Sequence, residues 1–180
     1  IISFSFLRNA MGTQQTPPNL VLVGLALFLT FFTMSPTITR IQEEAYEPYQ
    51  AEEISQEEFF ERASRPLAEF MVRNTQINTL EMFCNMAHVS MPDEVNTETV
   101  VESLPLRIIV PSFVTCELQK AFTIGLLLYI PFMLIDIVVL SIESSMSPSA
   151  AMISAPFKLL LFVTLNGWEL LFSTLVRDFH

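Results

Sequence analysis

The feature that most constrains the fold of this chain is the absence of charge over long stretches of sequence. No charged residue occurs between Arg8 and Arg40, and residues 20–38 form the most apolar part of that interval. Residues 121–142 and 157–176 are similarly apolar. A helix of about 20 mostly apolar residues spans the roughly 30 Å of hydrocarbon in a bilayer. We therefore predict an all-α integral membrane protein in which these three segments are hydrophobic helices.

The charged residues are concentrated in one part of the chain. Only 16% of all residues are charged, compared with roughly a quarter in soluble domains. Between Glu43 and Glu102 there are 14 acidic residues and three arginines, so this interval has a net charge of −11, whereas the whole chain has −10. Residues 40–117 are therefore predicted to form a helical, acidic extramembrane domain inserted between the first and second hydrophobic helices.

Two connecting segments complete the predicted layout. Residues 1–19 end in a polar run with two prolines and are predicted to form a polar loop. Residues 143–156 link the second and third hydrophobic helices. Because this link is short, the two helices that it joins are expected to form an antiparallel hairpin.

Helix signals are clear within the acidic domain. Ser55 and Glu58 have the spacing of a capping box, which predicts a helix start. Pro66 is predicted to start a second helix, because proline is favoured in the first turn. Residues 91–93 break the pattern, and a loop is expected from there to Ser103. Apolar residues of the second helix recur near a period of 3.6: Leu67, Phe70, Met71, Ile77, Leu80, Phe83, Cys84 and Ala87.

Five charged residues are candidates for functional or assembly contacts. Asp136, Lys158 and Glu169 lie inside hydrophobic segments, where a carboxylate costs about 2.5–3.5 kcal/mol and usually faces a partner or water. Asp136 is either a proton-relay or gating group, or a polar contact between subunits, for example with Lys158. The absence of a relay chain in the sequence favours the contact. Glu117 and Lys120 are three residues apart, on one helical face, and are candidate subunit contacts.

Several function classes find no support in the sequence. No catalytic or phosphate-binding motif is present, so neither an enzyme nor a cofactor is predicted. Cys84 and His88 are four residues apart, but two ligands do not make a zinc site, and no metal is predicted. Cys84 and Cys116 do not define a disulfide framework. The net acidity argues against nucleic acid, which needs basic contacts.

Five segments, in order along the chain, resemble the FliP family, the flagellar export-gate family with relatives in type III secretion. They are FLRNAMGTQQTPPN at 6–19, GLALFLTFFTMSP at 24–36, LRIIVPSFVTCEL at 106–118, IPFMLID at 130–136 and PFKLLLFVTLNGW at 156–168. The matches cover nearly the whole chain. Relative to the family, the given sequence is expected to lack the N-terminal signal and the first hydrophobic segment.

The resemblance implies a subunit of the flagellar type III protein export gate. Such a subunit would assemble with copies of itself and with FliQ and FliR into the channel through which unfolded flagellar proteins cross the inner membrane. Other membrane proteins of the export apparatus and membrane lipid would be further partners. The expected location is the bacterial inner membrane, in the flagellar basal body, with the acidic domain on the periplasmic side.

Three positions depart from the family pattern. The link before the last hydrophobic segment usually carries a run of methionines that is thought to line a flexible seal, whereas here Met146 stands among serines. Met146 is therefore the candidate gate residue. Asn166 replaces the usual aspartate, and Cys116 replaces a small hydroxyl residue. Two other functions remain open: an ion- or proton-coupled transporter that uses Asp136, Lys158 and Glu169, and a scaffold that does not transport.

Overall fold

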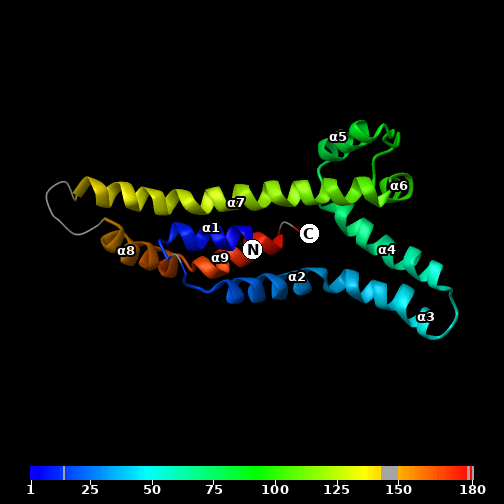
Figure 1. The fold of residues 1–180 in the computed structure, drawn as a ribbon, viewed down its shortest axis with the longest axis horizontal. Coiled ribbons are helices and arrows are strands. Elements are labelled where there is room, and N and C mark those ends of the chain that lie inside the picture. The colour runs from blue at the N-terminus through cyan, green and yellow to red at the C-terminus, as the bar shows by residue number, and fades with distance from the viewer. Residues whose placement is uncertain (14, 143–149, 178, 180) are drawn as a thin grey trace. The chain divides into compact units, whose positions relative to one another are not determined.

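The computed structural model describes residues 1–13, 15–142, 150–177 and 179, and over these residues the chain is helical with no strand. The all-α prediction is therefore confirmed. The chain forms two compact units, which we call the hairpin unit (residues 1–30 and 119–179) and the acidic unit (residues 31–118). Figure 1 shows the helices: α1 (Ile2–Ala10), α2 (Asn19–Ile41), the π-helix η1 (Gln42–Tyr46), α3 (Glu47–Gln50), α4 (Gln56–Arg73), α5 (Ile77–Ala87), α6 (Thr97–Ser103), α7 (Leu106–Ile142), α8 (Ala150–Thr164) and α9 (Gly167–Arg177).

Two described helices are long and apolar enough to cross a membrane. They run over Asn19–Gln50 and Leu106–Ser141, and only 6% of the most apolar window of the first is buried inside the chain. Leu20 and Phe28, for example, are 82% and 67% exposed. The pair α8 and α9 is bent by 62° and adds a third crossing if it is counted as one broken span. These findings confirm a membrane protein built from helical hairpins.

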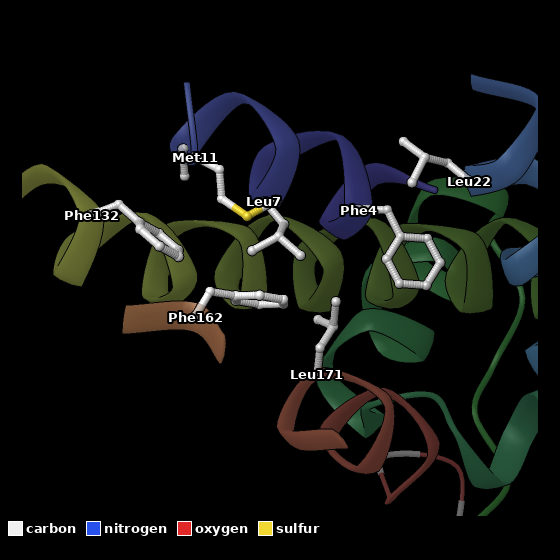
Figure 2. Packing of buried hydrophobic residues seen from close by; sticks show 8 residues of the cluster. Phe4, Leu7, Met11, Leu22, Phe132, Phe162 and Leu171 are labelled. Carbon is white, nitrogen blue, oxygen red and sulfur yellow. The ribbon is translucent and has the colours of Figure 1, made fainter. Parts of the chain in front are cut away.

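The core of the hairpin unit is formed by the short helix α1 together with α2, α7, α8 and α9. Figure 2 shows Phe4 and Leu7 of α1, together with Met11 directly after this helix, pointing toward side chains from the other helices. The buried members of this cluster are Phe4, Leu7, Ala10, Met11, Leu22, Phe132, Phe162 and Leu171. The large apolar residues of α1 therefore recur every three or four positions, as expected for a helix with one buried face.

Helix α1 packs closely on α7, although its residues were expected to lie in a polar loop. The rings of Phe6 and Phe122 are 5.8 Å apart in an edge-on arrangement, and the Ser3 hydroxyl donates to the Ala121 carbonyl at 3.4 Å. A Cβ atom on Gly125 would lie 2.5 Å from a Phe6 ring carbon. Glycine at this position therefore lets α1 approach α7.

The third hydrophobic segment is not one straight helix. It was expected to run through residues 157–176, but it bends after Thr164. Asn166 has a left-handed backbone with φ of 54°, a conformation that asparagine tolerates better than most residues. A Cβ atom on Gly167 would lie 2.2 Å from Phe162 ring carbons. The asparagine–glycine pair thus ends α8 and lets α9 start against its last turn.

The acidic unit has its own apolar core, formed by α4, α5, α6 and the beginning of α7. The fully buried side chains include Leu80, Val100, Ile108 and Ile109. The cluster of buried residues consists of Ala68, Val72, Leu80, Cys84, Val100, Leu104, Ile108 and Ile109. An independent core is consistent with a domain that lies outside the membrane segments.

The predicted helix start at Ser55 is confirmed, and two other expectations for this region are wrong. The Ser55 hydroxyl accepts a hydrogen bond from the Glu58 amide at 3.2 Å. Pro66 lies inside α4 and does not start a second helix; the break comes at Asn74–Gln76 instead. The expected loop up to Ser103 contains α6, whose start is stabilised by a capping box between Asn96 and Thr99.

Ion pairs connect the helices of the acidic unit. The Arg40 guanidinium donates to Glu69 at 2.6 Å, and it holds the pKa of that carboxyl below its usual range. Arg65 lies within 3.5 Å of Glu69 and within 3.8 Å of Glu98 on α6. Glu69 therefore contacts two arginines, one on α2 and one on its own helix.

Candidate functional site

The most distinctive polar contact in the hairpin unit is an ion pair between two hydrophobic helices. The Lys158 ammonium on α8 donates to Oδ2 of Asp136 on α7 at 2.6 Å. The Lys158 side chain is only 6% exposed, whereas that of Asp136 is 38% exposed. The structure thus brings together two of the residues singled out from the sequence, and it does so within one chain.

A ring contact between α7 and α8 accompanies the ion pair. The rings of Phe132 and Phe162 lie 6.5 Å apart, one helical turn from Asp136 and Lys158 respectively. From the ion pair to the ring contact, the residue number falls by four on α7, from Asp136 to Phe132, and rises by four on α8, from Lys158 to Phe162. The two helices therefore run antiparallel. Ser154, a further turn along α8, is also buried. The predicted hairpin is therefore confirmed, and Asp136 and Lys158 lie on its inner faces.

The different exposure of the two charges determines what the pair contributes. An ammonium that is almost completely enclosed needs a counter-charge, because removing one partner of a buried pair costs about 3–5 kcal/mol. Asp136 is more accessible and can be hydrated or contacted from outside the hairpin. Losing Asp136 therefore leaves the more enclosed charge unpaired and should cost more stability than losing Lys158.

Glu169 does not belong to this pair. It lies in the first turn of α9, where its carboxylate accepts a hydrogen bond from the Asn166 side chain at 2.7 Å. Within the described ranges, no hydrogen bond or ion pair joins Glu169 to Asp136 or Lys158. The three charges proposed for a coupled transporter are thus split into an ion pair and a local contact at the bend.

The other predicted site residues lie apart from the pair. Glu117 is half-buried on α7 within the acidic unit. Lys120 belongs to the hairpin unit, where its ammonium lies 5.7 Å from the centre of the Phe179 ring. Met146, the candidate gate residue, falls outside the described residues.

The aromatic cluster at the bend was not identified from the sequence. Trp168 contacts Phe162 with ring centres 5.2 Å apart and Phe172 at 5.8 Å, and Phe172 in turn meets Phe4 of α1 at 6.0 Å. The asparagine–glycine dipeptide at 166–167 is a strong turn signal and could have located the bend. Which aromatic rings fill the bend depends on tertiary packing.

No group of three or more histidine, cysteine, aspartate or glutamate side chains is arranged to hold a metal in the part of the chain that the structure describes. Cys84 is buried in the acidic unit, with its sulfur 3.4 Å from that of Met91, and burial raises the pKa of the Cys84 thiol. Its surroundings are those of a core residue. The features that remain for function are the paired charges, the bend and the exposed apolar helices.

Comparison with known proteins identifies the family. The FliP family model matches residues 1–175. The chain is 46% identical over its full length to the flagellar biosynthetic protein FliP of Pectobacterium carotovorum subsp. carotovorum, of which it covers 69%. It is 47% identical to FliP of Aquifex aeolicus and 44% identical to FliP of Buchnera aphidicola subsp. Acyrthosiphon pisum, covering 75% and 47% of those proteins. The chain belongs to the FliP family.

Proposed function

We propose that this chain is a subunit of the flagellar type III protein export gate. Family membership implies a role in flagellar export, and the apolar helices are those of a membrane-associated component. In this proposal the chain assembles with copies of itself and with FliQ and FliR in the bacterial inner membrane, at the flagellar basal body. Unfolded flagellar proteins pass through the resulting channel, with the acidic unit on the periplasmic side. The observation that carries the proposal is the family match over almost the entire chain.

The exposed apolar surface of the helices supports an assembly. Phe31, Leu126, Leu127 and Val138 are all more than half exposed. Lipid covers such residues in a membrane, and so do neighbouring helices. Membrane helices associate through close packing and polar contacts, and the half-exposed Asp136 offers such a contact on α7.

The length of α7 supports a subunit that extends out of the bilayer. This helix has 37 residues, so it is about 55 Å long at 1.5 Å per residue. The hydrocarbon of a bilayer is only about 30 Å thick. A large part of α7 therefore lies outside lipid, as expected for a helix that enters the acidic unit. The division of the chain into hydrophobic helices at 20–38, 121–142 and 157–176 is part of this proposal, as is a role for Met146 at the gate.

The proposal is tested with a chimera in a flagellated bacterium that lacks its own FliP. The host protein keeps its remaining sequence, and the segment homologous to residues 1–175 is replaced by that of this chain. We expect flagellin in the culture medium, swimming on soft agar and co-purification of the chimera with FliQ and FliR. A chimera that reaches the membrane but neither co-purifies with these subunits nor restores secretion contradicts the proposal. Co-purification without secretion would instead indicate the scaffold function.

A further inference from the structure

A group of exposed aromatic side chains lies where the chain turns from α2 to α4. We call residues 42–61, which comprise η1, α3 and the start of α4, the aromatic tip. Helix α3 lies at this turn (Figure 1) and continues directly from η1, and η1 packs against α4. A π-helix is rare and frequently occurs at functional sites.

One aromatic residue of the tip, Phe59, packs against other rings, whereas the remaining aromatic residues are exposed. The Phe59 ring packs on Tyr49 at 5.0 Å and on Phe60 at 5.5 Å between ring centres. Tyr46, Tyr49 and Phe60 are nevertheless 49%, 38% and 61% exposed. Ala45, next to Tyr46, is completely buried. Helix η1 thus packs through a small residue and leaves its tyrosine outside the core.

The same twenty residues contain eight glutamates and no lysine or arginine. Glu44 pairs with Arg40 and Glu58 with Arg62, both across one helical turn. The remaining carboxylates have no ion pair with any residue in the described ranges: Glu43, Glu47, Glu52, Glu53, Glu57 and Glu61. The exposed rings are therefore surrounded by uncompensated negative charge.

This combination restricts what can cover the rings. Lipid hydrocarbon is excluded, because so many carboxylates cannot enter it. A second copy of this chain is a poor match, because its nine basic residues are scattered from Arg8 to Arg177, and several of them are already paired. An arginine or lysine of another protein satisfies both features, since it binds a carboxylate and the face of an aromatic ring.

We propose that the aromatic tip is a docking surface for a basic segment of another protein. Cationic side chains of the partner pair with the free glutamates and lie over Tyr46, Tyr49 or Phe60. This interaction does not depend on the export function. It is an additional contact of the acidic unit, and its failure would leave the family assignment and the proposed channel untouched.

The test uses the full chain in nanodiscs of zwitterionic phosphatidylcholine, so that lipid charge does not attract the probe. The probe is a short fluorescent peptide of alternating arginine and serine, and binding is followed by fluorescence anisotropy. A tip variant and a control variant each lose three acidic charges at exposed residues that have no ion pair within the part of the chain that the structure describes. The tip variant is Glu43→Gln/Glu53→Gln/Glu61→Gln, and the control variant is Glu81→Gln/Asp93→Asn/Glu94→Gln.

We expect the tip variant to bind the peptide about tenfold more weakly than the control variant, because three exposed ion pairs are lost at the site. Removing the aromatic rings tests whether the rings themselves bind the peptide or whether negative charge alone attracts it. Tyr46→Ala and Phe60→Ala should each weaken binding about two- to fivefold, the usual contribution of a cation–π contact. Met82→Ala/Met86→Ala, which changes exposed apolar residues on α5, should have no effect.

Two results would overturn the proposal. One is equal affinity of the tip and control variants, which would mean that only the net charge matters. The other is unchanged binding by the double variant Tyr46→Ala/Phe60→Ala, in which both rings are removed. Circular dichroism checks that each variant keeps its helix content. If the variant without both rings unfolds, Phe60→Ala alone decides the question, since its ring is the most exposed and its loss should least affect folding.

Discussion

The ion pair of the hairpin predicts an unequal effect of removing its two partners. Asp136→Leu leaves the enclosed Lys158 ammonium without a counter-charge, and we expect a loss of about 3 kcal/mol of stability, the lower end for a broken buried pair. Lys158→Met leaves a carboxylate that is 38% exposed, which water or lipid headgroups can solvate. Its expected loss is therefore only about 1–2 kcal/mol, as for a partly desolvated hydrogen-bonding group.

The double variant Asp136→Leu/Lys158→Met should be more stable than Asp136→Leu alone. Replacing a buried ion pair with apolar residues of similar volume is often close to neutral. The double-mutant cycle should therefore give a coupling energy of about 4–5 kcal/mol, close to the sum of the two single losses. Glu169→Gln serves as the control, because Glu169 is exposed and, among the described residues, its side chain is bonded only to the nearby Asn166, and it should change stability by less than about 0.5 kcal/mol.

The single tryptophan of the chain provides the assay. Trp168 contacts Phe162 one turn from Lys158 on α8, so its fluorescence reports on packing within the hairpin unit. Unfolding in mixed micelles by increasing sodium dodecyl sulfate, followed at Trp168, gives the stability of each variant. Equal losses for the two single variants, or a coupling energy near zero, would refute the reasoning that the enclosed lysine depends on the aspartate.

Three further predictions concern the bend, the acidic unit and the helix cap. Gly167→Ala should cost about 1–3 kcal/mol and alter the Trp168 emission, because a Cβ atom there meets the Phe162 ring, whereas Gly24→Ala, with no atom within 4 Å of its Cβ, is the neutral control. The lowered pKa of Glu69 contributes stability that is complete above the usual carboxyl pKa and is lost as the pH falls through the lower folded value. Acid titration followed by circular dichroism should show this loss, and Glu69→Gln should remove that part of the pH dependence. Ser55→Ala should destabilise α4 by about 1 kcal/mol in thermal melts of the acidic unit, while Ser64→Ala, a serine inside the same helix, should have a smaller effect.

The sequence predicted those features that depend on local pattern. The short link indicated the hairpin, the apolar runs indicated membrane helices, and the serine at position 55 marked the start of α4. Asp136 and Lys158 were singled out because charges are rare in apolar segments. Each of these inferences rests either on residues that are close in sequence or on the composition of a single segment.

The features that were missed depend on packing between distant segments. Helix α1 has only nine residues, and such a short helix is stable only because its buried face meets α7, α8 and α9. Pro66 interrupts a hydrogen bond of α4, yet it is itself buried and the residues that follow it, Ala68 and Val72, pack in the core of the acidic unit, which offsets the roughly 3 kcal/mol that proline costs in a helix. The bend at Asn166 requires the Phe162 ring beside Gly167, a contact that no local pattern shows.

The position of the hairpin's two charges also has a consequence for biogenesis. Asp136 is synthesised 22 residues before Lys158, which corresponds to a delay of about 1–4 s at bacterial elongation rates of roughly 5–20 residues per second. During this interval α7 carries an unneutralised carboxylate and is a poor substrate for release into lipid. Once α8 emerges, the two helices can leave the insertion machinery together as an electrically neutral pair. We therefore expect the hairpin, rather than the single helix, to be the unit of membrane insertion.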